Sequence, residues 1–413
     1  MKPIRLATIA LVLGAVSSCS VYGQSPGYGP PQGPPPGYDY DRGYDSWPSP
    51  RDEVGFFYDE LSPWGDWVMT RDYGWAWFPR YVRPYWRPYT DGRWVVTEYG
   101  WTWVSFEPFG WATYHYGRWA WDPRFGWLWV PGTIWAPAWV SWQHGGGYVG
   151  WAPLPPEVGY EMGFGMRLGG FDLSIGIQPD HYSFVPERSF LEVHVSKYLV
   201  PTARNVSIIR ETTNITSYAN DGDRVVNRGV DVRRIEQATG QRVQQRRVAA
   251  APAKAPSAVE RDEVRIYRPQ RQQLEKVRVG PRVNAGLRPE TPAAGTGAAK
   301  PPVERRDAPD RVVAPRAEQV PPTDEKQLEK QERREQQELA RFQAEEQRKL
   351  DRIQRQETAK VRGQAERVQV EKRHGVEREA LQQQQRKATQ QLEARQKAKR
   401  QAAQAKPLVR NKR

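Results

Sequence analysis

Aromatic and small residues alternate in a repeated unit between residues 53 and 157. The unit reads Gly-x-Trp, then a short spacer, then aromatic-Gly-Trp-x-Trp. Its clearest copies are "DYGWAWF" (72–78), "EYGWTWV" (98–104) and "RFGWLWV" (124–130). Alternation with period two places both tryptophans of a W-x-W pair on one face of a β-strand. The glycine before each pair permits the tight bend of a hairpin. The pattern therefore predicts a β-hairpin for each copy.

The copies recur every 26 residues, at Gly74, Gly100 and Gly126. A period of this size indicates stacked supersecondary units. A fourth, divergent copy, "AWVSWQHGGGYVGWAPL" (138–154), has a triple glycine at its bend. We therefore expect residues 53–157 to form an all-β, tryptophan-rich hairpin-repeat domain, a meander of about eight short strands.

The next two segments have different patterns. Residues 158–248 contain β-branched residues around an "NDGD" turn, and "DVRRIEQATG" (231–240) has an Asp N-cap and a terminal glycine. These signals predict a small α/β appendage with one hairpin and one short helix. Residues 249–324 are rich in Ala, Pro, Arg and Glu without a period, which is typical of a disordered linker.

Residues 325–405 are strongly charged, and their sparse apolar residues recur 11 positions apart, with a two-residue slip after Val361. This spacing predicts a long charged helix, because 11 residues complete about three turns. The thin stripe fits a coiled coil with a partner, including a second copy of the chain, or a solitary helix held by i,i+4 ion pairs. A basic tail, residues 406–413, follows. The stripe comprises Leu328, Leu339, Leu350, Val361, Val370, Leu381, Leu392 and Ala403.

The N-terminus is typical of an export signal, predicted here over residues 1–23. Lys2 and Arg5 precede an apolar run at 6–16, which is shorter than the ~20 apolar residues that span a bilayer. No later segment of the sequence is apolar enough to cross a membrane.

Two alternatives remain for the processing of this signal. Cys19 follows "VSS" and fits a lipobox, in which the cysteine becomes acylated; ordinary cleavage after "VYG" (21–23) is the alternative. Residues 24–52 are dominated by Pro and Gly, which predicts a flexible tether. The membrane would then be contacted only through a lipid anchor on Cys19.

Composition divides the chain at similar positions. All 18 tryptophans lie between Trp47 and Trp151, whereas the net charge of +14 is concentrated after residue 250. A basic arm beside a nearly neutral aromatic part suggests an acidic polymer as a partner. Because Glu and Gln are mixed through the arm, a merely solvated arm is the alternative.

Candidate catalytic chemistry is sparse. None of the five histidines has metal-ligand spacing with Cys19 or with another histidine. His115 lies among aromatic residues, where a hydrogen-bonded structural role is expected. The acidic residues of the repeat lie mostly in turns, where they cap backbone N–H groups. Phosphate-binding and nucleophile-elbow motifs are absent from the sequence. We therefore expect no enzymatic activity, no catalytic residue, no metal and no cofactor.

Binding is the class of function that the sequence supports better. The 32 aromatic rings of residues 53–157 exceed what one small core can bury, so part of the ladder is expected to be exposed for stacking. A fully buried aromatic core is the alternative. An envelope glycan or an envelope protein would fit such a face. Nucleic acid outside the cell and a carbohydrate-active enzyme are the other candidates. The expected contact residues are Trp75, Trp77, Trp101, Trp103, Trp119, Trp121, Trp127 and Trp129.

The stretch from "FFYDELSPWGDWV" (56–68) through "YGWTWVSFEPFGWATYHYGRWAWDPRFGWLWV" (99–130) to "YVGWAPLPP" (148–156) resembles an uncharacterised family of secreted bacterial proteins, domain of unknown function 6600. The resemblance covers about a quarter of the chain and carries over no catalytic residue. It implies an exported protein of a Gram-negative envelope, in the periplasm or at the outer membrane. On that basis we expect a non-catalytic envelope binding or scaffolding protein.

Overall fold

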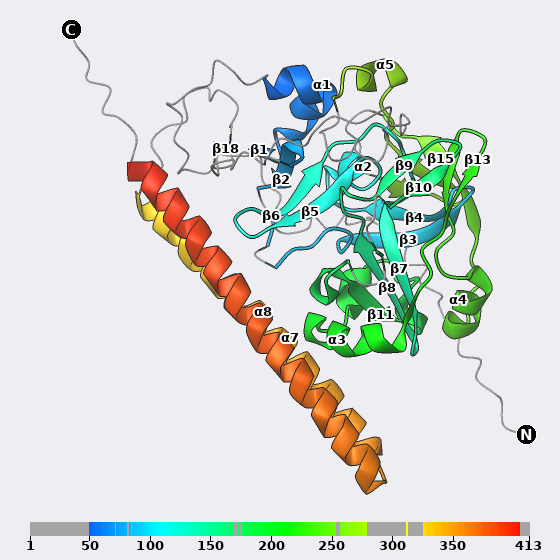
Figure 1. Ribbon diagram of the computed structural model, residues 1–413, viewed down its shortest axis with the longest axis vertical. Coiled ribbons are helices and arrows are strands. Elements are labelled where there is room, and N and C mark those ends of the chain that lie inside the picture. Colours follow the sequence, from blue (N-terminus) through cyan, green and yellow to red (C-terminus); the bar gives the residue numbers. More distant parts are fainter. Residues whose placement is uncertain are drawn as a thin grey trace, which may run out of the picture.

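The computed structural model of the protein describes residues 49–70, 72–80, 82–83, 85–168, 172–173, 176–252, 257–278, 311–312 and 325–404. Within these ranges the chain is a mixed α/β structure in which antiparallel strands form several sheets (Figure 1). The expectation of an all-β domain is wrong in part, because α1 (Pro50–Leu61) precedes the first hairpin and α2 (Gly110–Thr113) lies between the second and the third. The predicted signal peptide and Cys19 lie outside the described residues.

Four β-hairpins form where the repeat predicts them. Cross-strand tryptophans face one another in each, for example Trp119 with Trp129 and Trp142 with Trp151. Alternation along the strands thus places the W-x-W rings on a common face, as predicted. The paired strands are β1 (Gly65–Thr70) with β2 (Gly74–Pro79), β3 (Gly92–Thr97) with β4 (Gly100–Ser105), β5 (Arg118–Asp122) with β6 (Gly126–Val130), and β7 (Val140–Gly145) with β8 (Tyr148–Pro153).

The hairpins do not form one meander. The first and third join in a sheet of order β18-β1-β2-β6-β5, in which β18 is Arg311–Val312. The second lies inside a seven-stranded sheet, β13-β14-β4-β3-β15-β17-β16, and the fourth inside β11-β8-β7-β12. The predicted meander is therefore wrong, because the free edges of the hairpins pair with strands distant in the sequence.

The remaining elements of the globular body follow in chain order. The strands are β9 (Gly159–Glu161), β10 (Gly165–Arg167), β11 (Ser183–Pro186), β12 (Thr213–Asn214), β13 (Tyr218–Asp221), β14 (Arg224–Asn227), β15 (Gln245–Ala250), β16 (Ala258–Val259) and β17 (Glu263–Ile266). The helices are α3 (Asn205–Ile208), α4 (Val232–Thr239) and α5 (Arg271–Leu274), with 3₁₀ turns η2 (Pro179–His181), η3 (Glu187–Ser189), η4 (Val195–Tyr198), η5 (Thr202–Arg204) and η6 (Ile209–Glu211).

The predicted hairpin around "NDGD" and the predicted short helix are confirmed as β13–β14 and α4. Asp231 caps α4 by accepting from the backbone N–H of Arg233 (2.8 Å), and Gly240 ends it with φ +68°. The segment is not a separate appendage, since β11, β12, β14 and β15 pair directly with repeat strands.

The disordered linker expected at 249–324 is wrong for 249–252 and 257–278. Residues of these two ranges complete β15 and form β16, β17 and α5. β15 and β17 pair in parallel and β16 pairs with β17. This charged segment therefore forms part of the seven-stranded sheet. Apart from 311–312, the rest of the predicted linker lies outside the described residues.

Gly100 shows why each hairpin turn needs a glycine. Its φ is +80°, and a β-carbon there would lie 2.0 Å from the carbonyl oxygen of Asn227. That close approach is where β14 pairs with β4, Asn227 opposite Gly100. The glycine thus permits both the left-handed turn and the contact with a distant strand.

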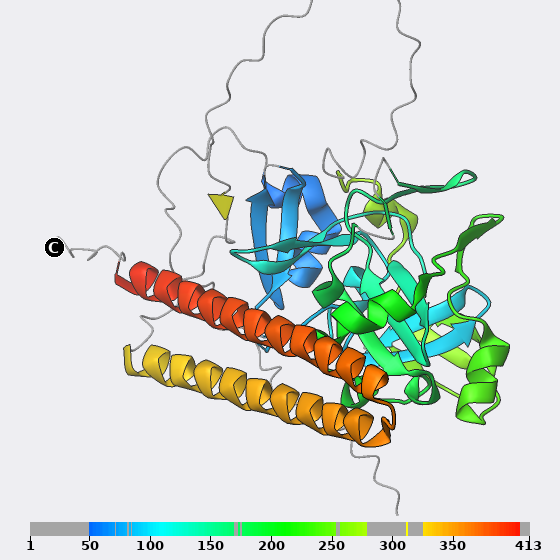
Figure 2. The same ribbon diagram turned by 60° about the horizontal axis from the view of Figure 1, so that its bottom comes forward.

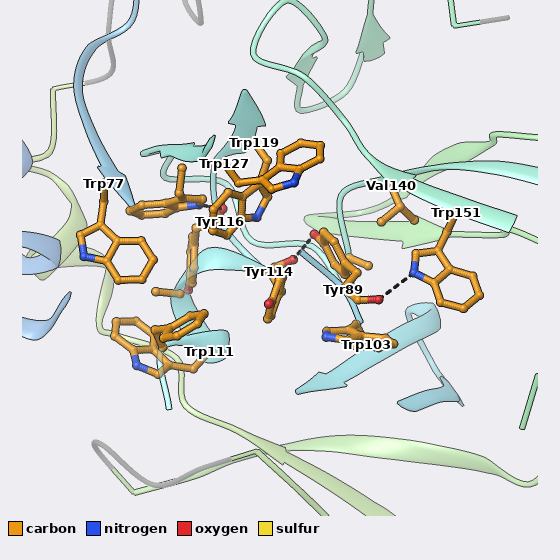
Figure 3. Close-up of a cluster of buried hydrophobic side chains, with 14 of the residues drawn as sticks. Trp77, Tyr89, Trp103, Trp111, Tyr114, Tyr116, Trp119, Trp127, Val140 and Trp151 are labelled. Atoms are coloured by element: carbon orange, nitrogen blue, oxygen red, sulfur yellow. Dashed lines mark hydrogen bonds between the residues drawn. The ribbon is translucent and has the colours of Figure 1, made fainter. Parts of the chain in front are cut away.

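The core of the body is aromatic, and several of its indole N–H groups donate to backbone carbonyls. Trp101 donates to Val230 (2.7 Å), and Trp129 donates to Tyr116 (2.7 Å). Figure 3 shows the same arrangement at Tyr89, whose carbonyl accepts from Trp151 (2.9 Å). These donors are therefore buried without the cost of an unmade hydrogen bond. Four other buried indole N–H groups have no hydrogen-bond partner among the described residues, those of Trp67, Trp94, Trp103 and Trp135.

The C-terminal segment is a hairpin of two helices, α7 (Glu325–Lys360) and α8 (Gln364–Gln404), which lie side by side in Figure 2. The single long helix that we expected is wrong. The interval between Val361 and Val370, two residues short of the 11-residue period, contains the turn. The aliphatic stripe is the seam between the two helices: Leu328, Leu339, Leu350, Leu381 and Leu392 are all buried. None of the described helices is long and apolar enough to span a bilayer.

The helical hairpin contacts the body through a mostly polar interface. Arg204, at the end of η5, reaches Glu357 of α7 (2.6 Å) and Glu377 of α8 (3.5 Å). Ala203 packs with Leu350 and Leu381 in a small apolar cluster beside these charges. The contact joins residues more than 140 positions apart, so it is tertiary structure that local sequence patterns do not specify.

Candidate functional site

Seven of the eight ladder tryptophans are buried, and the expectation that they form an exposed face is wrong. Their exposed fractions are 5% or less, whereas Trp121 is 41% exposed. Part of the cover comes from outside the repeat, since Phe190, Val230 and Ile235 belong to the same core. The buried rings are Trp75, Trp77, Trp101, Trp103, Trp119, Trp127 and Trp129.

Trp121 is placed at the surface by its position near the end of β5. It stands opposite Trp127 in β6, and the two rings meet edge to face with centroids 5.4 Å apart. The His181 ring lies behind this pair, 4.7 Å from Trp127. Burial lowers the pKa of His181, and neighbouring Arg87 and Lys387 oppose the contrary effect of Asp180. The rings of Trp127 and His181 therefore both lie against Trp121.

A shallow groove, which we call the Trp121 groove, lies beside Trp121. The β5–β6 hairpin that carries Trp121 points toward the long helices (Figure 1). The enclosed volume of the groove is about 50 Å³, so the groove can receive the edge of a larger ligand but cannot enclose one. Three parts of the chain line it: Phe78, Pro79, Val82, Arg83 and Trp86 after β2; Trp121, Pro123, Arg124, Phe125, Gly126 and Trp127 in the β5–β6 hairpin; and Gln391, Leu392 and Arg395 of α8.

Three arginines line the groove, and one of them, Arg124, forms an ion pair with Asp122. Asp122 fixes Arg124 by accepting from its Nε (3.2 Å) and Nη2 (2.9 Å), and the guanidinium lies 5.1 Å from the Phe125 ring centroid. Burial raises the pKa of Asp122, but the hydrogen bonds and charge of Arg124 outweigh it and hold that pKa below its usual value. Arg83 is exposed and Arg395 is half-buried. The lining residues include no acid.

Residues 58–158 match a protein family over the span of the four hairpins. The match is to the family of unknown function DUF6600. No curated protein and no solved structure matches the chain. The DUF6600 domain thus contains the aromatic repeat and two of the three stretches that line the Trp121 groove, while α8 lies outside the match.

Two titratable groups inside the DUF6600 domain, His115 and Glu107, are engaged structurally. His115 is fully buried, its Nδ1 lies 2.9 Å from the carbonyl of Ala136, and burial lowers its pKa to about 4. The predicted structural role of His115 is confirmed. Glu107 is buried as well, and its carboxylate accepts from Trp86 (2.5 Å) and from the Tyr114 hydroxyl. Neither group lines the groove.

We find no metal-binding site in the part of the chain that the structure describes. No group of three or more His, Cys, Asp or Glu side chains could hold a metal ion there. The Trp121 groove instead combines flat rings with guanidinium donors. Such a combination can stack against an apolar ring face and hydrogen-bond to anionic oxygens.

Sequence reasoning named Trp121 and Trp127 but missed the arginines of the groove. Arg124 carries a local signal, because it occupies the exposed turn "DPRFG" beside the ladder. Arg83 lies in a Pro-rich connector, and Arg395 is more than 260 residues away in α8. Nothing in the local sequence indicates that these two lie beside Trp121.

Proposed function

We propose that the protein is an exported, non-catalytic binding protein of the cell envelope that holds an acidic polysaccharide at the Trp121 groove. The observation that carries the proposal is the combination of the one exposed ladder ring, Trp121, with Arg83, Arg124 and Arg395 in a groove lined by no acid. The predicted signal peptide and the tether support location in the envelope, with or without a lipid anchor on Cys19.

The chemistry of the groove favours a sugar acid over a neutral sugar. The flat indole of Trp121 offers a surface for the C–H face of a pyranose ring. Guanidinium groups bind carboxylates through paired N–H donors, which gives geometric selectivity as well as attraction. A groove that is open and shallow accommodates an internal segment of a polymer, since the chain can continue at both ends.

Hydrolysis of the bound sugar is not part of the proposal. Glycosidases act through two carboxyl groups that flank the scissile bond. The residues that line the Trp121 groove include neither aspartate nor glutamate, and the nearest supporting acid, Asp122, is engaged by Arg124. These features support binding and scaffolding as the role of the site.

The experiment is a titration of the full chain with polygalacturonate, monitored by calorimetry, with neutral dextran as the reference polymer. Trp121→Ala should weaken binding about tenfold, as expected for the loss of one stacking ring. Replacing Arg83, Arg124 and Arg395 together with glutamine should abolish the preference for polygalacturonate over dextran. Tyr198→Ala is the matched control, because Tyr198 is 40% exposed but lies outside the groove.

Two results would contradict this function. If Trp121→Ala bound polygalacturonate as tightly as the unmodified chain does, the groove would not be the binding site. Preferential binding of a single-stranded oligonucleotide, with affinity that falls steeply as salt rises, would favour nucleic acid as the ligand instead.

A further inference from the structure

The helix α7 carries a regular row of exposed arginines. Arg334, Arg341, Arg348 and Arg355 are seven residues apart and all are exposed. At 1.5 Å per residue, neighbouring members are about 10.5 Å apart along the helix axis. The row drifts by only about 20° per step, so the four side chains stay on one side of α7. We call this set the arginine row.

The arginine row is not neutralised by the rest of the molecule. No ion pair joins any of its four members to a carboxylate among the described residues. Two glutamates share this side of α7, Glu338 and Glu345, but Glu345 is bound to Lys349 (2.8 Å). Toward the turn, Arg352 adds a further cation four residues after Arg348. Asp351, the acid between them, accepts from the side chain of Gln347 (2.8 Å).

Three acids of the helical hairpin are turned inward. Glu332 is 2% exposed and is engaged by Arg400, and Glu377 is fully buried beside Arg204. Glu346 is 7% exposed and accepts from the backbone N–H of Thr202 (3.2 Å). Docking on the body and pairing of the helices therefore use these three carboxylates, and the exposed residues of α7 include more arginines and lysines than acids.

We infer that the arginine row is a track for an acidic polysaccharide with one carboxylate per disaccharide. This inference rests on the proposed function and names the class of polymer. The distance between neighbouring arginines corresponds to the length of two linked pyranose rings, so each arginine meets the carboxylate of one repeat. Duplex DNA carries a charge about every 1.7 Å and offers no such period. Exposed ion pairs are individually weak. Four such pairs that form in register with one polymer chain add their contributions.

The test compares two variants of the full chain that lose the same charge. The row variant replaces Arg334, Arg341, Arg348 and Arg355 with glutamine. The control variant replaces Arg367, Lys372, Arg386 and Lys397 of α8 with glutamine; these are also exposed but irregularly spaced. The probe is hyaluronan, which has one carboxylate per disaccharide, and affinity is measured by calorimetry at constant salt.

The row variant should bind hyaluronan about a hundredfold more weakly, the sum of four weak ion pairs, whereas the control should lose about threefold. Replacing the four arginines with lysine should restore most of the affinity, because charge and spacing are kept. Equal losses in the row and control variants would overturn the inference, since net charge alone would then explain binding. Trp121→Ala separates the two proposals: if it weakens binding while the row variant does not, the groove stands and the track is wrong.

Discussion

The globular body and the helical hairpin bury their apolar residues in opposite ways. The body contains large rings drawn from strands far apart in sequence, and several of its indoles donate to backbone carbonyls such as those of Leu61 and Thr113. Each helix of the hairpin carries one line of aliphatic side chains spaced 11 residues apart. The body therefore depends on non-local contacts, and the hairpin depends on a local period together with a polar contact to the body.

Aromatic and charged residues thus have separate roles in the globular body and in its contact with the helical hairpin. Tryptophan, the most conspicuous residue of the sequence, is chiefly a core residue, and Trp121 is the member of the ladder that reaches the surface. Charged residues form the contact between the two regions, since Arg204 pairs with both Glu357 and Glu377. The Trp121 groove is formed at the same junction, because one of its walls is α8.

The largest effect is expected from removing a buried ring of the body. Trp129 is fully buried and donates to Tyr116 (2.7 Å). Trp129→Ala should lower the free energy of unfolding of the body by about 3–5 kcal/mol, measured by denaturant unfolding. Trp121→Ala is the comparison and should cost about 1 kcal/mol or less. Similar losses in both variants would contradict the division between core and surface rings.

A smaller and more local effect is expected at the junction. Arg204→Ala leaves Glu377 buried without its cation, and breaking a buried pair in this way costs about 3 kcal/mol. Much of that cost disappears if the helical hairpin leaves the body, so we expect detachment instead of global unfolding. Hydrogen exchange should accelerate in η5 and α3 while the core strands β3 and β4 stay protected. Unchanged exchange at η5 and α3 would show that the ion pairs do not hold the hairpin.

The smallest effect concerns the pH dependence of the stability of the body. The pKa of His115 is lowered to about 4 by burial, whereas an unfolded histidine has a pKa of about 6.5. As pH falls below 6.5, the unfolded state takes up a proton that the folded state refuses, so stability falls until about pH 4. Between about pH 7 and pH 5 the expected loss is about 2 kcal/mol.

His115→Gln is the variant that checks this pH dependence. Glutamine does not titrate, so the variant should be less stable at neutral pH but should lose less stability on acidification. The measurement is urea unfolding of both proteins at the two pH values. The same pH dependence in the two proteins would mean that another group is responsible.

Local features of the fold could be predicted from the sequence. The period of two and the recurrent glycines gave the four hairpins, and Asp231 with Gly240 gave α4. The 11-residue stripe gave the seam of α7 and α8, and the slip after Val361 marked the turn, although we did not interpret it as one. These features depend on neighbouring residues, for which backbone geometry is sufficient.

Non-local features could not be predicted in the same way. The pairing of β14 with β4 and of β15 with β3 joins segments more than 120 residues apart. The burial of the ladder was misjudged because we counted only the residues of the repeat, whereas Phe190, Val230 and Ile235 also cover it. Arg395 joins the groove through the docking of α8, which no pattern near Trp121 encodes.

Hydroxyl-radical footprinting of the eight ladder tryptophans, with and without polygalacturonate, tests the central claim most directly. Trp121 should be oxidised readily, the other seven should be protected, and the polysaccharide should protect Trp121. Comparable oxidation of Trp101, Trp103, Trp127 or Trp129 would contradict the buried ladder. Unchanged oxidation of Trp121 at a saturating concentration of polysaccharide would contradict the groove as its binding site.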